Sequence, residues 1–504
     1  MQIKISLSVV FLSAVVLTFL FYKQGIGLNL LLFEILFIGW LFFSKQLTSE
    51  SMLEKLTLSG MLLTGVFTVI TYSTYVYVVH FLAIFLFVGV LNFKAITSLF
   101  SAFGVSFVSL FSSQIAFVGT VFFGESRTSL KLRKALWKSR IFIIPILIVA
   151  VFLTIYGFSN PIFGDYLGVF GEMIENVFTF IFENINLSFV FTFIFCTAIS
   201  IFLLFRVRVP LAEKNEKNTT QNLFRTKKKE KRVFKLSALK SEYKAGIFLL
   251  VTLNFLLLIL NSLDIYLVWF NFEWNGETLK QFVHEGTYLL IISILISIAV
   301  VLYFFRGNLN FYKKNKWLKY LAYAWIAQNA VLAISVAIRN FWYIKYFALA
   351  YKRIGVILFL LLVLYGLFTV FRKIQHTKTS FYLFQKNTLA LYLILVVSSL
   401  VNWDSVIAKY NFAYADSAYL HLEYISDLSD KALPHLNKTE EELNATYNFQ
   451  QQKYPYPYVT MNHEEYTQKI AARNKTFSKK WEGKNLLSWN LAEYLAYEKL
   501  KSEE

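Results

Sequence analysis

Long apolar segments alternate with short polar segments over residues 1–403 of the chain. A helix needs about 20 apolar residues to cross a hydrocarbon core of about 30 Å, because each residue adds about 1.5 Å to its length. Most of the apolar segments are close to this length, and the charges lie between them. The pattern predicts eleven membrane-spanning helices, over residues 5–22, 26–43, 56–72, 75–91, 141–158, 187–205, 245–268, 281–305, 321–343, 354–371 and 388–401.

The loops between the predicted spans are rich in lysine and arginine. The loop 206–244 contains thirteen Lys or Arg residues against four Glu. The loops 124–140, 306–319 and 372–386 are also basic, whereas the loop 159–186 contains four acidic residues and no base. Because Lys and Arg beside a span resist translocation, the basic loops are predicted to be cytoplasmic. The N-terminus is then cytoplasmic as well, and the residues after the last span are extracytoplasmic.

The segment 95–123 fits this pattern less well than the other apolar segments. It carries no charge, but seven side chains give it a polar side: Ser98, Ser101, Ser106, Ser109, Ser112, Ser113 and Gln114. It is predicted either as a twelfth span or as a pair of helices that lie in the membrane interface. An interfacial position places the lysines of the first loops in the cytoplasm, so the positive-inside rule favours this alternative.

The last hundred residues have a nearly balanced charge and helical patterns. They are short of aliphatic residues for an independent core, so we expect a tail that rests on the membrane part or on a protein partner. The predicted fold is an all-α polytopic transmembrane helical bundle with a small C-terminal α-helical tail. Its predicted parts are N-terminal membrane helices (1–205), a basic cytoplasmic loop (206–244), C-terminal membrane helices (245–403) and an extracytoplasmic tail (404–504).

The composition agrees with a membrane protein. The chain is 57% hydrophobic and only 16% charged, with a mean hydropathy of +0.52, whereas soluble domains are about a quarter charged. The formal net charge of +19 lies in the short loops between the spans, which is typical of topology signals rather than of nucleic-acid binding. The expected partner is the lipid bilayer, and the loop 206–244 could also hold anionic lipid headgroups at about 1 kcal/mol per base.

The sequence contains no recognisable catalytic or metal-binding motif. The single cysteine, Cys196, cannot form a disulfide or a thiolate metal site within one chain. The His284-Glu285 pair would need a second histidine at position 288 for a zinc helix, and Tyr288 stands there. P-loop, nucleophile-elbow and dinucleotide-binding patterns are also absent from the sequence. We therefore predict no catalytic residue, no cofactor and no metal.

Ionisable residues within predicted spans are candidate functional positions, because an unpaired charge is costly in a membrane. Asp264 and Arg339 lie near the outer ends of their spans, and Glu285 lies in the first turn of another. Membrane carboxylates usually pair with bases, so a structural pair of Asp264 or Glu285 with Arg339 is expected. The alternative is a substrate pocket that Asp264, His284, Glu285 and Arg339 form together.

Two further ionisable residues, Glu34 and His80, fall near the middle of predicted spans. If both were buried and adjacent, they could relay protons. The alternative is that a neighbouring hydroxyl group satisfies the histidine, since Thr and Tyr are frequent in the chain.

Several short strings together resemble a known family. They are Tyr156-Gly-Phe-Ser-Asn-Pro-Ile-Phe163, Gln281-Phe-Val-His-Glu-Gly-Thr-Tyr288, Arg339 with Tyr343 and Tyr346, Ala350-Tyr-Lys-Arg-Ile-Gly355, Val401-Asn-Trp-Asp404, Asp416-Ser-Ala-Tyr-Leu420 and Leu428-Ser-Asp-Lys-Ala-Leu-Pro434. They resemble the bacterial polytopic membrane group catalogued as domain of unknown function 4173, which is related to the 4153 group. The resemblance covers roughly residues 130–440.

The resemblance implies a multi-pass protein of the bacterial inner membrane, and it transfers no catalytic residue. It adds polar positions to the candidate functional sites, which are then Asn160, Asp264, His284, Glu285, Arg339, Arg353, Asn402 and Asp416. Three functions remain open on the sequence. We favour a membrane scaffold or sensor that couples the outer tail to the cytoplasmic loops. A transporter that uses the intramembrane polar groups is the second hypothesis, and a lipid-modifying enzyme is the third.

Overall fold

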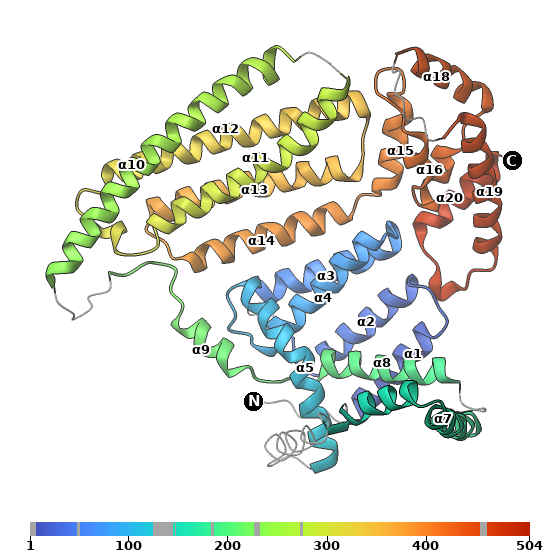
Figure 1. The fold of residues 1–504 in the computed structure, drawn as a ribbon. Coiled ribbons are helices and arrows are strands. Elements are labelled where there is room, and N and C mark those ends of the chain that lie inside the picture. The colour runs from blue at the N-terminus through green and yellow to red at the C-terminus, as the bar shows by residue number, and fades with distance from the viewer. Residues whose placement is uncertain are drawn as a thin grey trace.

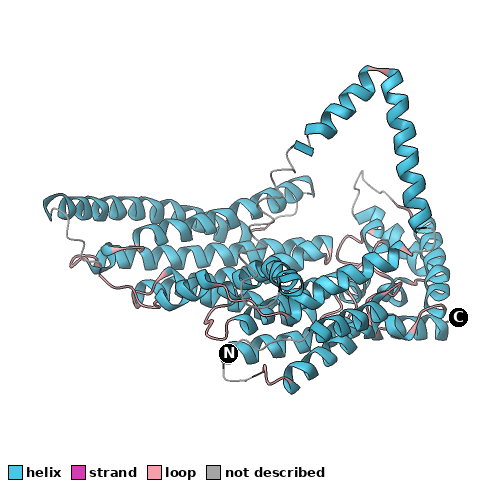
Figure 2. Ribbon diagram, turned by 90° about the horizontal axis from the view of Figure 1, so that it is seen from below, coloured by secondary structure: helices cyan, strands magenta, loops and turns pink. Residues whose placement is uncertain are grey.

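The structure confirms the predicted all-α architecture. It is a computed structural model, and it describes residues 7–47, 51–123, 145–146, 148–182, 186–225, 232–272, 276–453 and 461–503. These residues form helices and loops, with one isolated β-bridge between Asn222 and Lys378 and no strand (Figure 2). Eight helices are long and apolar enough to cross a membrane, and four shorter apolar helices accompany them among the described residues. The chain is therefore a multi-pass membrane protein.

The N-terminal helices pack around one apolar core. Leu41, Met61 and Phe87 come from three different helices and are fully buried in it. Ser51, Ser73 and Asn186 begin their helices with side chains that accept hydrogen bonds from backbone N–H groups of the first turn. The N-terminal helices that contribute to this core are α1 (Leu7–Phe21), α2 (Leu28–Phe43), α3 (Met52–Ile70), α4 (Thr74–Asn92), α5 (Leu99–Phe123) and α8 (Leu187–Leu204).

Helix α5 (Leu99–Phe123) runs across the direction of α8 (Figure 1). Near its start, Ser101 Oγ donates a hydrogen bond of 2.8 Å to Glu216, and further along Phe117 contacts the ring of Phe205 just after α8. Both contacts lie at the same end of the bundle. By length and composition α5 counts among the eight candidate spans. It is one continuous helix rather than the pair of helices that the interfacial alternative describes.

The C-terminal helices form a second apolar core, with Leu250, Ile294, Leu318 and Leu332 fully buried. Figure 1 shows them lying side by side in green, yellow and orange. Their bounds are α10 (Arg232–Asp264), the π-helix η1 (Ile265–Phe270), α11 (Gly276–Phe304), α12 (Lys316–Phe347), α13 (Tyr351–Gln375) and α14 (Ser380–Ser399).

Loops that were predicted to be cytoplasmic meet at one end of the molecule. The bridge between Asn222 and Lys378 joins the loop 206–244 to the loop 372–386, and Lys378 Nζ donates to Asn222 Oδ1 at 2.7 Å. Gln385 donates to the carbonyl oxygen of Thr97 at 2.6 Å, which brings the start of the α5 segment to the same place. The short helices α9 (Pro210–Asn218) and η2 (Asn308–Phe311) lie in these loops. The basic loop 124–140 lies outside the described residues.

The segment after Asn160 differs from the expected outer loop. The chain leaves the helix at Asn160, as the following proline predicts, but a new helix α7 (Pro161–Phe182) starts at once. Proline is well suited to the first position of a helix, because its missing N–H would have no partner there. Pro161 therefore marks a break between two helices instead of a helix end.

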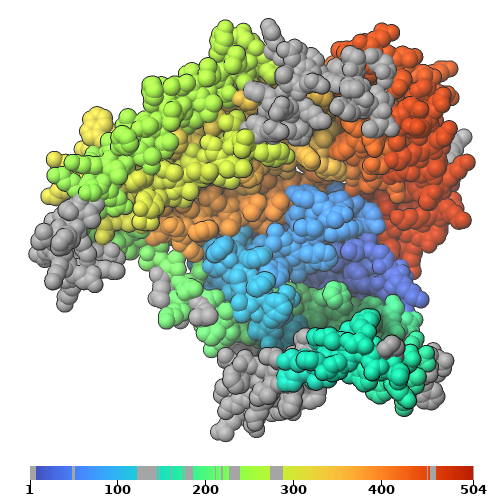
Figure 3. Space-filling view, viewed as in Figure 1, coloured from blue at the N-terminus to red at the C-terminus, as the bar shows by residue number. Residues whose placement is uncertain are grey.

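The tail after residue 403 forms a third core, which is larger than the sequence suggested. Ile407, Ile425, Leu433 and Leu436 are fully buried there, and Ile354 of α13 belongs to the same core. The tail thus shares its core with the membrane part, against which it lies in Figure 3. Its helices are α15 (Trp403–Ala413), α16 (Leu422–Ser426), η3 (Asp430–Ala432), α17 (Leu433–Leu436), α18 (Glu440–Lys453), α19 (His463–Glu482), η4 (Leu486–Ser488) and α20 (Leu491–Glu503).

Candidate functional site

A buried ion pair joins α10 to α12. Arg339 Nη2 lies 2.5 Å from Asp264 Oδ1, and both residues are 5% exposed. One of the two expected pairings is therefore present. His284 and Glu285 fall within α11, but their side chains lie outside the part that the structure describes.

Polar contacts continue along the α10–α12 interface on both sides of this pair. Gln328 Nε2 donates to Asn254 Oδ1 at 2.8 Å, and Asn261 donates to the carbonyl oxygen of Gln328 at 3.0 Å. Beyond the pair, the indole of Trp342 in α12 donates to the carbonyl oxygen of Val268 in η1 at 3.0 Å. Each of these bonds joins one helix to the other, so the interface is cross-linked along its length.

Arg353 holds the turn between α12 and α13. Its guanidinium donates to the carbonyl oxygens of Phe347 and Ala348 at the end of α12, and it lies over the ring of Tyr343 at 4.3 Å. A cation at the C-terminal end of a helix interacts favourably with the free carbonyl groups there. Ala348 adopts a φ of 62°, which this set of bonds stabilises. Asn411 of α15 then ties the tail to the turn through Leu349, with bonds of 2.7 and 3.0 Å.

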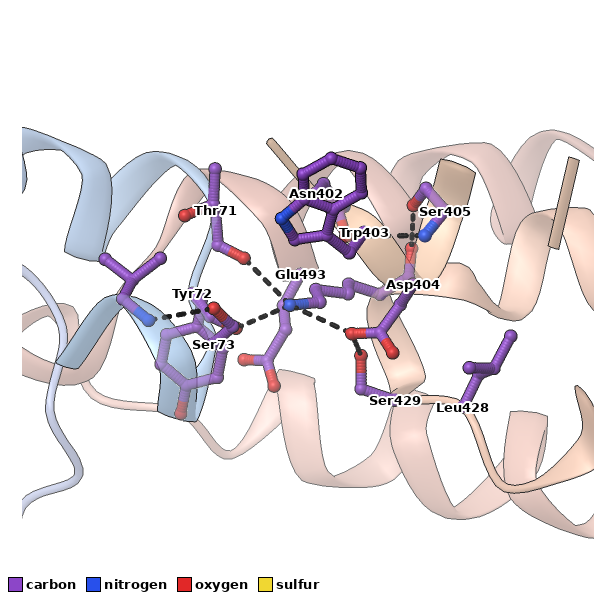
Figure 4. A network of polar contacts seen from close by, with 12 residues as sticks. Thr71, Tyr72, Ser73, Asn402, Trp403, Asp404, Ser405, Leu428, Ser429 and Glu493 are labelled. Carbon is purple, nitrogen blue, oxygen red and sulfur yellow. Dashed lines mark hydrogen bonds and ion pairs between the residues drawn. The ribbon is translucent and has the colours of Figure 1, made fainter. Parts of the chain in front are cut away.

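Lys431 of the tail lies within an extended set of polar contacts. Its Nζ donates to the carbonyl oxygens of Thr71 and Tyr72 at 3.0 Å each and lies 3.1 Å from Asp404 Oδ2. An ammonium group has three donors, so all three are used. Figure 4 shows the three bonds converging from the α3–α4 turn and from the start of α15.

Asp404 is the centre of this site. Its carboxylate also accepts hydrogen bonds from Tyr351 Oη at 2.5 Å and from Ser429 Oγ at 2.6 Å. Lys431 and Asp404 are 5% and 6% exposed. We call the set Thr71, Tyr72, Tyr351, Asp404, Ser429 and Lys431 the tail joint, because it connects the end of α3 and the start of α13 to the tail.

The charges in the tail joint stabilise each other. Burial alone would raise the pKa of Asp404, but the Lys431 ammonium and the bonds from Ser429 and Tyr351 lower it below its ordinary value of 3.8. Burial lowers the pKa of Lys431, and the Asp404 carboxylate opposes that shift. Asp404 is therefore ionised at neutral pH, and Lys431 provides its counter-charge.

A second ion pair lies next to the tail joint. Lys484 pairs with Glu493 of α20, and Asn490 donates to the same carboxylate oxygen at 2.8 Å. The Lys484 ammonium also lies 4.6 Å from the ring centroid of Tyr72. Tyr72 has a φ of 44°, so the tail contacts on both its carbonyl and its ring fix an unusual backbone conformation.

The other sequence-predicted positions do not form a common site. Asn402 begins α15 and accepts from the backbone of Ser405 at 3.4 Å, which places it beside the tail joint. Asn160 is exposed at the start of α7, where its side chain accepts from Phe163 N–H at 3.3 Å. Asp416 is also exposed, and its backbone carbonyl accepts from Lys453.

The residues of the tail joint were not among the functional positions predicted from the sequence. Lys431 lies in a string used for the family resemblance, but a lysine in a charge-balanced tail is usually solvated. The signal that could have identified Lys431 is its apolar sequence context, Leu428-Ser-Asp-Lys-Ala-Leu-Pro434. Within the described residues, no group of three or more His, Cys, Asp or Glu could hold a metal ion. The bonds of the tail joint hold the end of α3, the start of α13 and the tail together.

No curated protein and no solved structure matches the chain. A family model does match, over residues 35–439, and its description is "Domain of unknown function (DUF4153)". The match includes the first residue of the tail joint, Thr71, and the last, Lys431. It also corrects the number that the sequence resemblance suggested, from 4173 to the related 4153 group. The family model matches more than half of the chain. The chain therefore belongs to the DUF4153 family of integral membrane proteins of unknown activity.

Proposed function

We propose that this protein is a membrane scaffold or sensor, in which the tail joint couples an extracytoplasmic tail to the helix bundles. The observation that carries this proposal is the position of Lys431. One side chain of the tail binds the end of α3 in the N-terminal bundle and, through Asp404, reaches Tyr351 at the start of α13 in the C-terminal bundle. A displacement of the tail must break or move these bonds.

The buried polar groups are paired with each other, which favours a scaffold over a transporter. The transporter hypothesis expects Asp264, His284 and Arg339 around one cavity near the middle of the membrane. Asp264 and Arg339 instead lie against each other at 2.5 Å, at the ends of α10 and α12 that face the tail. A lipid-modifying enzyme would need a reactive group at an open cleft, and the groups of the tail joint are buried and bonded.

The proposal is tested by releasing the tail. Lys431→Met keeps the length of the side chain but removes its charge, which leaves Asp404 buried without its cation. Removing one partner of a buried pair costs about 3–5 kcal/mol. We expect limited proteolysis of the variant in membranes to cut the tail much faster than in the wild type.

Lys469→Met is the matched control. Lys469 also pairs with an aspartate of the tail, but the side chains of Lys469 and Asp427 are 35% and 68% exposed. Such a surface pair contributes at most about 1 kcal/mol, so proteolysis should remain close to the wild-type rate. Equal cleavage rates of Lys431→Met and wild type would contradict the proposed coupling.

The proposal also includes an orientation, with the basic loops in the cytoplasm and the tail outside. Arg225 and Lys480 are both exposed. Arg225 follows Asn222 in the loop 206–244, which meets the loop 372–386, whereas Lys480 lies in α19 of the tail. In a Cys196→Ala background, a membrane-impermeant thiol reagent applied to intact cells should label Lys480→Cys and not Arg225→Cys. Labelling of Arg225→Cys alone would reverse the orientation.

A further inference from the structure

The N-terminal bundle contains a second polar site, which is independent of the tail joint. Glu34 of α2 and His80 of α4 approach each other across α3, where His80 Nε2 lies 4.0 Å from Glu34 Oε2. Glu34 is 2% exposed, and His80 and Thr64 of α3 are 0% exposed. Both carboxylate oxygens and His80 Nε2 are buried without a hydrogen-bond partner among the described residues.

Gly65 makes room for the carboxyl group of Glu34. A Cβ atom at position 65 would overlap Glu34 Oε2. Glycine weakens the interior of a helix by about 0.5–1 kcal/mol relative to alanine. At this position the absence of a side chain lets the carboxyl group lie directly against the backbone of α3, next to Thr64. The close approach is therefore a specific feature of the packing between α2 and α3.

The hydrogen bonds of Thr64 assign the tautomer of His80. Thr64 Oγ1 lies 2.8 Å from the carbonyl oxygen of Gly60 and 3.0 Å from that of Met61, and both can only accept. The single hydroxyl proton is donated to them, so Thr64 Oγ1 accepts from His80 Nδ1 at 3.1 Å. His80 Nδ1 therefore carries a proton. The second ring nitrogen, Nε2, faces Glu34.

This arrangement has one favourable protonation state. If neither Nε2 nor the carboxyl group carries a proton, a negative charge is buried, and if both do, a positive charge is buried. With one proton between them the pair is neutral overall. We propose that Glu34 and His80 together form a proton-binding site that holds a single proton within the N-terminal bundle.

A proton fits this site better than a metal ion does. Hard cations such as Mg²⁺ and Ca²⁺ require about six or more oxygen ligands. The described residues contain no group of His, Cys, Asp or Glu that could hold a metal ion. The separation of 4.0 Å between Nε2 and Oε2 closes to a hydrogen bond with a side-chain shift of about 1 Å. The pair can therefore pass or share a proton without a change in the backbone.

Other ionisable groups lie on the helices around the pair. The described parts of α1 and α5 carry no charged residue. Tyr392 of α14 is 2% exposed and approaches α3 at Gly60, where a Cβ would overlap its hydroxyl group. The remaining ionisable residues on α3, α4, α14 and the contacting α20 are Glu54, Lys55, Tyr75, Tyr77, Tyr382, Lys386, Glu493, Tyr494, Tyr497, Glu498, Lys499, Lys501 and Glu503.

The test compares the two halves of the pair in the purified full-length protein. His80→Gln leaves a buried carboxyl group that must keep its proton, so the unfolding temperature should fall as the pH rises from about 5 to about 8. Glu34→Gln leaves a buried imidazole that must stay neutral, so the unfolding temperature should fall as the pH decreases over the same range. The double variant has no titrating group at the site. The wild type should lose stability relative to it above about pH 6.5, because the folded pair keeps a proton that the unfolded histidine releases.

The proposal is supported if the unfolding temperatures of the two single variants change with pH in opposite directions. The proposal is overturned if both unfolding temperatures change with pH in the same direction, or if both change as in the double variant. Glu464→Gln and His376→Gln change an exposed acid and an exposed histidine, and they give the background slopes. If one single variant does not fold, the slope of the other relative to the double variant still decides the sign. Lys431→Met has no expected effect on this contrast, so the result is separate from the test of the tail joint.

Discussion

Lys431 Nζ lies 3.0 Å from the carbonyl oxygen of Thr71, and 360 residues separate the two along the chain. The contact is possible because α3 ends at the same end of the molecule from which the tail emerges (Figure 1). A lysine at this position satisfies carbonyl groups at the end of α3 that have no partner within the helix. The tail therefore completes the end of a helix in the first bundle.

Tyr351→Phe should weaken the tail joint without changing its shape. The substitution removes the hydroxyl group that donates to Asp404 Oδ1 at 2.5 Å and leaves this buried oxygen without that donor. Hydrogen bonds to charged groups contribute about 1.5–3 kcal/mol, so we expect a loss of about 2 kcal/mol in the free energy of unfolding. Unfolding in a chemical denaturant measures this change in the free energy of unfolding. Tyr320→Phe, at a side chain that is 61% exposed, should have no effect.

Asp264→Asn should strongly destabilise the C-terminal bundle. It removes the counter-charge of Arg339, whose burial then costs about 3–5 kcal/mol. Asp264→Asn combined with Arg339→Gln removes both charges and should cost less than the sum of the single changes. A double-mutant cycle on the free energy of unfolding measures this coupling. Strict additivity of the two substitutions would show that the pair is not coupled.

Gly65→Ala tests the packing against Glu34. The new methyl group would overlap the Glu34 carboxyl group, and such overpacking costs about 1–3 kcal/mol. Gly39→Ala is the matched control, because no atom lies within 4 Å of a Cβ built at that position of α2. It should be neutral or stabilise by up to about 1 kcal/mol, since alanine favours helix. The difference between the unfolding temperatures of the two variants is the measured quantity.

His435 should make the tail sensitive to acid. Burial, together with the charges of Lys409, Lys499 and Lys438, lowers the pKa of His435 from 6.5 to about 4. The unfolded chain takes up a proton in this range and the folded chain does not, so stability is lost as the pH falls from 6.5 to about 4. His435→Gln removes this loss. The variant should unfold at a higher temperature than the wild type near pH 5 and should match it near pH 8.

The sequence predicts those features that depend on the cost of burying a charge. Asp264 and Arg339 lie in apolar segments, so each requires a partner, and the positions of the two along their predicted spans place them at similar depth. The helical bundle itself follows from the length and spacing of the apolar segments. The gathering of the basic loops at one end follows from the alternation of spans.

Features that depend on contacts between distant residues are not visible in the pattern. Tyr351 begins an apolar span and has the appearance of a residue of the membrane interface, although it binds Asp404. The helix α7 was missed because a proline after an asparagine usually marks a turn. The proximity of Glu34 and His80 depends on Gly65, whose role appears only when α2 and α3 are packed.

The tail joint also has a consequence for the order of assembly during synthesis. Thr71 and Tyr72 emerge from the ribosome long before Lys431, and at about 5–20 residues per second the interval is on the order of tens of seconds. During this time the end of α3 has no lysine to bind. The end of α3 can therefore make its final contacts only after residue 431 has been synthesised, and until then the carbonyl groups of Thr71 and Tyr72 lack this donor.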